Sequence, residues 1–179
     1  MPHLIARQIA FRHFPHIDKD AASHFGCHIG LIGEHLVAAR LISWGYNTIV
    51  VGNNLPYDLI TEVGHQTVRI QVKSKLGGNG DSWTFDLTPS SAGRTKDGPN
   101  RYARTDFHLA ALVVLRMGYV SFTASAARSF EVRIPTARML DPDYERHQFE
   151  ALLFDVGALS KEQFHALRGH VGAPGPDHT

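Results

Sequence analysis

Cysteine is almost absent from this chain of 179 residues, which contains only Cys27 and can therefore form no internal disulfide. A protein of this kind needs no oxidising compartment, so we expect a cytoplasmic, intracellular location. No apolar run approaches the roughly 20 residues that a membrane-spanning helix requires. The segment from Met1 to Ala22 is interrupted by histidines, by Arg12 and by Pro15, unlike a secretory signal peptide. We therefore exclude a disulfide scaffold and expect no membrane partner.

An excess of charge of either sign is also missing. Lys and Arg number 18 and Asp and Glu 17, so the formal net charge is only +1 and gives no sign of nucleic-acid binding. The exception is a local cluster of basic residues with a single acid, Asp97, in a stretch where Gly, Ser and Pro are frequent. The basic residues are Arg94, Lys96, Arg101 and Arg104. We predict a basic loop there, for which phosphate binding and ordinary solvation remain equally open.

The length and the 43% apolar content indicate one globular domain with short appendages. We expect an N-terminal arm over residues 1–23, a folded domain over 24–170 and a disordered, Gly- and Pro-rich tail over 171–179. The chain contains no internal repeat.

Hydrophobic spacing predicts the elements of the domain. Apolar residues follow helical spacing from about Cys27 to Ser43, and Gly45 is suited to end this helix. Gly64-His65 predicts a tight turn that joins two strands as an antiparallel hairpin. The β-rich segments are 48–51, 58–63, 66–75, 82–87, 107–116, 119–123 and 130–134. Helices are expected at 144–154 and 160–168, the last beginning with a capping box at Ser160. The segment 107–116 is apolar on both faces, as in a central strand.

Four polar residues carry the candidate chemistry. Glu34 lies on the first helix, Asp58 at the start of one predicted strand, and Gln71 and Lys73 on the next. Apolar residues occupy the even positions of that second strand, so Gln71 and Lys73 share the opposite face. If these groups converge, they supply what metal-assisted phosphodiester cleavage needs. Oxygen ligands hold a hard cation such as Mg²⁺, and a lysine steadies the attacking water and the charged phosphate.

The order and spacing of several motifs, more than any single motif, are informative over about Gly26 to Pro135. These motifs are Gly33-Glu34 with Val37-Ala38-Ala39, Trp44-Gly45-Tyr46, Pro56-Tyr57-Asp58-Leu59-Ile60, Val68-Arg69-Ile70-Gln71-Val72-Lys73, and Tyr102 with Asp106-Phe107. Together they resemble the PD-(D/E)XK nuclease superfamily, in the branch where Gln-x-Lys replaces acid-x-Lys. Within it, the chain is similar to the small endonucleases that include a group I intron-encoded homing endonuclease. The resemblance implies an α/β fold with a mixed central sheet flanked by helices, a restriction-endonuclease-like core.

The resemblance also implies a metal-dependent DNA endonuclease and the role of each residue. Asp58 would bind the metal directly, Glu34 would bind it directly or through water, and the Val72 carbonyl would complete the shell. Gln71 stands where the family has a carboxylate, and Lys73 matches the catalytic lysine. The implied cofactor is Mg²⁺, with Mn²⁺ as a substitute. Because an amide oxygen is neutral, we expect weaker metal binding than in acid-x-Lys enzymes.

DNA is the implied partner. Because each chain supplies one active site and a duplex has two strands to cut, we also expect a homo-oligomer, either a dimer or a tetramer. Two other classes remain open. A catalytically degenerate DNA-binding module is one, since Gln71 replaces an acid. An interaction protein with an incidental polar face is the other.

Some residues keep two interpretations. Lys75 shares a face with Lys73, so it either contacts a phosphate near the cut or is a solvated strand-end lysine. Asp106 either orders the basic loop or approaches the site as a supporting acid, or else it caps the start of a strand. A zinc site around His24, Cys27 and His28 lacks four ligands at an accepted spacing, so we expect an incidental or buried thiol.

Overall fold

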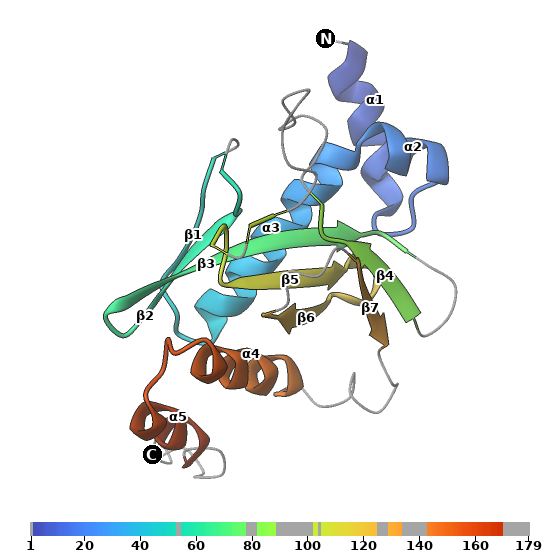
Figure 1. Cartoon of the computed structure of the whole chain (residues 1–179). Coiled ribbons are helices and arrows are strands. Elements are labelled where there is room, and N and C mark those ends of the chain that lie inside the picture. The colour runs from blue at the N-terminus through green and yellow to red at the C-terminus, as the bar shows by residue number, and fades with distance from the viewer. Residues whose placement is uncertain are drawn as a thin grey trace, which may run out of the picture.

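The computed structural model describes residues 2–52, 55–77, 82–88, 102–103, 105–124, 129–133 and 143–169, with the side chains of 2–4 and 129–133 excepted (Figure 1). Three helices and a short 3₁₀ turn precede the first strand. They are α1 (Pro2–Ala10), η1 (Phe11–His13), α2 (Lys19–His24) and α3 (Gly26–Ser43). The predicted helix over 27–43 is confirmed as α3, and Gly45 follows it with a φ of +92°.

The central sheet has five strands in the order β1-β2-β3-β5-β6. Their bounds are β1 (Thr48–Val50), β2 (Leu59–Val63), β3 (Gln66–Lys75), β5 (Leu109–Val114) and β6 (Tyr119–Thr123). All neighbouring pairs are antiparallel except β3 and β5, which are parallel. A parallel pair needs a long crossover connection, and here it runs from Leu76 to His108. The predicted mixed sheet flanked by helices is therefore confirmed.

Both faces of this sheet are covered. The even residues of β3 and the odd residues of β5 pack against α3 and α4 (Tyr144–Asp155), around Val37, Leu41 and Phe149. On the other face, Leu112 and its neighbours in β5 pack against Trp83 and other aromatic residues. All six residues of β5 are buried, which confirms the central strand that the apolar run predicts.

The second cover is a small sheet of its own. β4 (Ser82–Asp86) pairs antiparallel with β7 (Ser129–Arg133), not with the central sheet. Sequence alone predicts both strands but not this separate pairing, because alternation reports which face is buried and not which strand lies alongside. The arrangement is important for the site, because β4 brings residues 86–88 over the polar face of β3.

Helices flank the two ends of α3. In Figure 1, α1 and α2 lie near its N-terminal end, and α4 and α5 (Lys161–Gly169) lie at the opposite end. The capping box that opens α5 is confirmed: the Ser160 N–H donates to Gln163 Oε1 over 2.8 Å, and the Gln163 N–H donates to Ser160 Oγ over 3.2 Å. A 3₁₀ turn, η3 (Leu115–Met117), links β5 to β6. None of the described helices combines the length and apolar character needed to cross a membrane.

The expected N-terminal arm contains α1, η1 and most of α2. Phe11 and Phe14 from this region pack against the main core. The tail 171–179 and most of the basic segment lie outside the described residues, so the domain boundaries stay a prediction.

Candidate active site

The site forms where β2 parts from β3. The two strands pair as far as Leu59 and Ile70, and one residue earlier the Asp58 N–H still donates to the Ile70 carbonyl over 2.9 Å. Val72 follows Ile70 by two residues on β3, so its backbone N–H and C=O point toward the same edge as those of Ile70. At that point β2 has already ended. The Asp58 carboxylate accepts the Val72 N–H there, at 2.7 Å. The backbone of Asp58 thus makes the last hydrogen bond between β2 and β3. Its carboxylate then accepts the Val72 N–H in place of the backbone carbonyl that a longer β2 would offer.

Gln71 completes this arrangement from β3. Its side chain is only 5% exposed, and its amide nitrogen donates to Asp58 Oδ2 and, over 3.1 Å, to the Val72 carbonyl. A polarised N–H group therefore lies between two oxygen atoms of the kind that a cation would bridge. The sequence places Gln71 on a polar face, but in the structure its side chain is buried.

Glu34 reaches the site from α3 because the helix lies very close to the sheet. A Cβ at Gly33 would lie 1.7 Å from Ser74 Oγ and 2.8 Å from Ser74 Cβ, which only a glycine avoids. This approach brings Glu34 within electrostatic range of Asp58. Partial burial raises the pKa of the Glu34 carboxyl, and the negative charge of Asp58 raises it further.

Lys73 lies on the same face of β3 as Gln71. Its ammonium donates to the Thr88 carbonyl over 2.9 Å and lies 5.5 Å from the centre of the Tyr102 ring. Burial lowers the pKa of Lys73, while the negative charges of Asp58 and Asp86 oppose the decrease. The ammonium is therefore held by a carbonyl, an aromatic ring and a nearby acid, and it remains within range of Asp58.

Burial also raises the pKa of the Asp58 carboxyl. The Val72 N–H, the Lys73 ammonium and the Gln71 amide act in the opposite direction without cancelling the increase. The described site thus has two acids whose charged forms are disfavoured by burial, and the charge of Asp58 further disfavours that of Glu34. Carboxyl groups with raised pKa values are common at functional sites, where a bound cation stabilises their charged forms.

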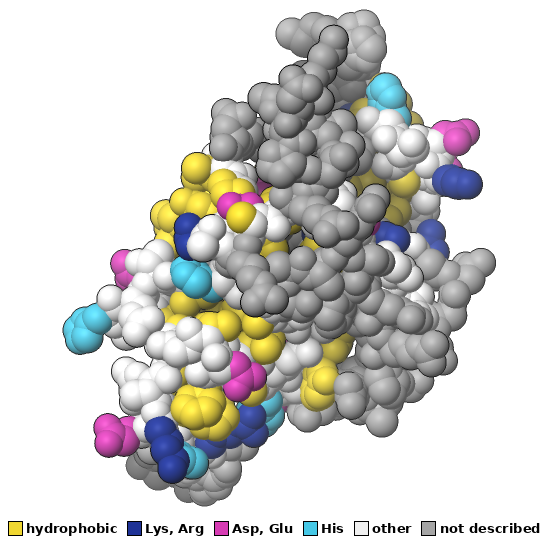
Figure 2. Space-filling model, in the orientation of Figure 1, with side chains coloured by type: hydrophobic (Ala, Val, Ile, Leu, Met, Phe, Trp, Pro, Cys, Tyr) yellow, Lys and Arg dark blue, Asp and Glu magenta, His cyan; other side chains and the backbone are white. Residues whose placement is uncertain are grey.

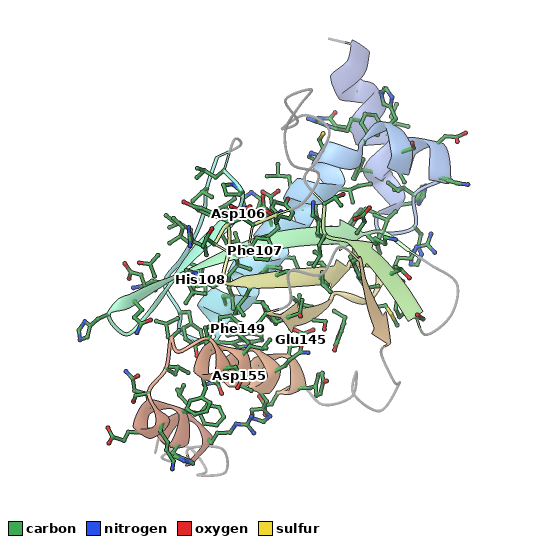
Figure 3. All side chains as sticks on the ribbon, in the orientation of Figure 1. Asp106, Phe107, His108, Glu145, Phe149 and Asp155 are labelled. Carbon is green, nitrogen blue, oxygen red and sulfur yellow. The ribbon has the colours of Figure 1, made fainter. Side chains whose placement is uncertain are left out.

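Tyr102 and Asp106 frame the approach to β5, and Figure 3 shows Asp106, Phe107 and His108 in succession there. Asp106 accepts the Ala103 N–H at 2.7 Å and donates its own N–H to the Ala103 carbonyl at 3.0 Å. Asp106 therefore orders the turn before the strand. Tyr102 packs edge-on against Phe107, and burial, with the charges of Asp58 and Asp106, raises the pKa of Tyr102 to about 12.

The donor atoms fit a hard divalent cation of modest affinity. Among the described residues, no three His, Cys, Asp or Glu side chains gather as a metal site, so any ion here must also use neutral oxygens. Glu34 and Asp58 offer carboxylates and Val72 a carbonyl. A half-turn of the Gln71 amide would replace its nitrogen by its oxygen between these atoms. Oxygen ligands of this kind, completed by water, suit Mg²⁺ or Mn²⁺.

The structure therefore brings together Glu34, Asp58, Gln71, Val72 and Lys73 from three separate elements. Lys75 lies further along β3, exposed, with its ammonium 5.8 Å from the centre of the Phe85 ring. The remaining basic candidates, Arg94, Lys96, Arg101 and Arg104, lie outside the described residues.

The hydrogen bond of Lys73 to Thr88 and the nearby charge of Asp86 have no signal in the sequence, because they arise only when residues 86–88 lie over β3. Cys27 is exposed, while the neighbouring His24 and His28 rings pack against Phe25 and Phe11. Because Cys27 is exposed, the expectation of a buried thiol is wrong.

Comparison with known proteins shows the family and the fold of the chain. Residues 27–148, more than half of the chain, match the family of PD-(D/E)XK endonucleases. Among solved structures, the fold is similar to that of a bacterial homing endonuclease, I-Ssp6803I, with a TM-score of 0.55 and 19% identity over 73% of this chain and 94% of that one. This likeness confirms the restriction-endonuclease-like core. A search of curated protein sequences finds no significant match. The chain belongs to the PD-(D/E)XK endonuclease family.

Proposed function

We propose that this protein is a divalent-metal-dependent DNA endonuclease that hydrolyses phosphodiester bonds at the site formed by Asp58 and Lys73. The observation that carries the proposal is the convergence of two acids, a neutral amide, the backbone carbonyl of Val72 and a partly buried lysine at the point where β2 leaves β3. Membership of a nuclease family supports the same reaction class.

The residues of the chain would act as follows. Asp58 and the Val72 carbonyl hold the ion, and Glu34 supplies a second negative charge from α3. Mg²⁺ or Mn²⁺, when bound, lowers the pKa of a coordinated water and stabilises the charge that develops on the phosphate. Lys73 keeps its ammonium beside that phosphate and orients the attacking water. The expected product carries a 5′-phosphate, as the family resemblance implies.

Gln71 is the residue that decides between an enzyme and a degenerate binding module. In the present arrangement its amide nitrogen satisfies Asp58 and Val72 without any ion. Metal binding requires the amide to turn or withdraw, which costs the two hydrogen bonds. We therefore expect a weaker metal site than one with a third carboxylate. The Gln71→Glu variant should bind Mg²⁺ at least as tightly as the wild type, measured by calorimetry, and loss of binding would mean that Gln71 is structural.

A homo-oligomer, dimer or tetramer, follows from the proposed reaction. Each chain supplies one site, and cutting a duplex requires two sites in opposite orientations. Sedimentation equilibrium with and without DNA tests this point, since a strict monomer in both conditions would limit the protein to nicking.

Cleavage of supercoiled, linear and branched DNA with Mg²⁺, Mn²⁺ or EDTA tests the function itself. Asp58→Ala and Lys73→Ala should abolish metal-dependent cutting and leave DNA binding largely intact. Asp155→Ala and Lys161→Ala are the matched controls, because both residues are exposed and lie on or beside the C-terminal helices. Cutting by Asp58→Ala would contradict the proposed site. DNA binding by the wild type without any cutting would favour the degenerate module.

A further inference from the structure

Three cations stand in a row on one face of β3, each against an aromatic ring. They occupy odd positions of the strand, so their side chains leave the sheet on the same side. The pairs are Arg69 on Tyr57, Lys73 on Tyr102 and Lys75 on Phe85, with distances to the ring centres of 5.6, 5.5 and 5.8 Å. The proposed cleavage site uses only the middle member, and the family-based expectations include Lys75 but not Arg69.

Arg69 is joined to His108 by the backbone. The Arg69 N–H donates to His108 Nδ1 over 2.9 Å, and the His108 N–H donates to the Arg69 carbonyl over 2.9 Å. An Nδ1 atom that accepts a hydrogen bond carries no proton, so the neutral ring has its proton on Nε2. Burial and the charge of Arg69 both lower the pKa of His108, which keeps the ring neutral. His108 therefore presents one fixed N–H donor beside the Arg69 guanidinium.

This pair carries positive charge without a counter-ion among the residues that the structure describes. The salt bridges described there involve Arg40 with Glu145 and Arg146 with Glu150, and neither includes Arg69. Stacking on Tyr57 occupies a face of the guanidinium and leaves its edge N–H groups available. The pair is partly exposed, and in Figure 2 a basic side chain and a histidine adjoin at the surface in the area where Figure 3 labels His108.

We propose that Arg69 and His108 form a phosphate-binding subsite for the nucleic-acid backbone, on the side of the cleavage site opposite Lys75. The inference rests on the proposed function, because it places the subsite relative to the phosphate at Lys73. Alternate residues of a strand are roughly 7 Å apart, so Arg69 lies roughly 14 Å along β3 from Lys73. A B-form strand advances about 3.4 Å per nucleotide, so a strand lying along β3 would place the two contacts about four nucleotides apart.

Phosphate is the chemistry that this geometry fits. A guanidinium edge binds phosphate oxygens through two parallel hydrogen bonds, and a neutral imidazole N–H adds a third donor. The ring beneath Arg69 holds the side chain in place before binding, so less conformational entropy is lost. The row of ring-backed cations thus offers successive contacts to a polyanion, and no donor in it selects a base.

The test measures DNA binding in EDTA, without cleavage. Fluorescence anisotropy with a labelled duplex at several salt concentrations compares the wild type with Arg69→Gln and His108→Asn. Asparagine keeps an acceptor for the Arg69 N–H but lacks the Nε2–H donor. Arg168→Gln is the matched control, because Arg168 also stacks on an aromatic ring, Phe164, at 5.2 Å but lies on α5.

The expected result is a shallower salt dependence for Arg69→Gln, by about 0.9 in the slope of log K against log salt. Affinity should fall roughly tenfold to hundredfold, as for a lost charge-assisted hydrogen bond. His108→Asn should lose affinity to a smaller extent, and Arg168→Gln should match the wild type. Circular dichroism and thermal unfolding confirm that each variant is folded, and Arg69→Lys, which keeps the charge, should retain the slope.

The outcomes separate this inference from the proposed function. If the wild type cuts DNA while folded Arg69→Gln keeps the wild-type slope and affinity, the subsite is overturned and the nuclease stands. If Arg69→Gln loses slope and affinity while no metal supports cutting by the wild type, the subsite stands and the proposed function fails.

Discussion

The contact between Gly33 and Ser74 controls whether Glu34 reaches the site, and it predicts the effect of one methyl group. A Cβ at Gly33 would lie 1.7 Å from Ser74 Oγ and 2.8 Å from Ser74 Cβ. Rotation of Ser74 can move its Oγ, but its Cβ is fixed by the strand. Gly33→Ala therefore forces α3 away from β3 until the second distance reaches the 3.4 Å of ordinary contact. The helix that carries Glu34 must move with it.

The magnitude follows from two opposing effects. Overpacking of this severity costs about 3 kcal/mol, the upper end of the usual range, while alanine in place of glycine inside a helix returns about 1 kcal/mol. We expect Gly33→Ala to lower the free energy of unfolding by about 2 kcal/mol, which for a chain of this size lowers Tm by roughly 4–8 °C. Because a shift of about 1 Å costs on the order of a hundredfold in rate, the smaller shift here should reduce cleavage on the order of tenfold.

The decisive test places Gly33→Ala in a protein that also carries Ser74→Gly. The Ser74→Gly change removes both clashing atoms, and the next contact of a Cβ at Gly33 is then Val72 Cγ1 at an ordinary 3.8 Å. In that background Gly33→Ala should become stabilising by up to about 1 kcal/mol and should restore cleavage. Urea unfolding and cleavage rates of the four proteins measure the coupling. If Gly33→Ala has the same effect on stability and rate with Ser74 and with Gly at that position, the reasoning is refuted.

Three further predictions concern the site and α5. Because burial raises the pKa of Asp58, Mg²⁺ affinity should begin to decrease on acidification at a pH above the ordinary pKa of 3.8, and calorimetry that shows constant affinity down to pH 3.8 would contradict this. A carboxyl with a raised pKa destabilises the fold once ionised, so Asp58→Asn should be more stable than the wild type in urea at neutral pH, and the difference should disappear below pH 3.8. Ser160→Ala removes one half of the α5 capping box and should cost about 1 kcal/mol with unchanged cleavage; a loss of cleavage in that variant would show that α5 affects the site.

Local sequence patterns predicted much of the fold. The helical spacing before Ser43, the Gly64-His65 turn, the doubly apolar run of β5 and the capping box at Ser160 are each fixed by neighbouring residues. Their physical causes are periodic burial, positive φ at glycine and reciprocal side-chain capping, all of which operate within a few residues. The order of the motifs was also sufficient to identify the endonuclease family.

Only the tertiary structure decided how the site is assembled. The sequence suggested that Gln71 faces a polar surface, whereas the folded chain buries its side chain and brings Thr88 to Lys73. The pairing of Arg69 with His108 depends on the parallel register of β3 and β5, which join residues 39 positions apart. Such contacts between residues distant in the sequence depend on the residue at which each strand ends and on how closely α3 packs against the sheet. Periodicity shows which face of an element is buried, but the partner on that face is chosen by packing over the whole chain.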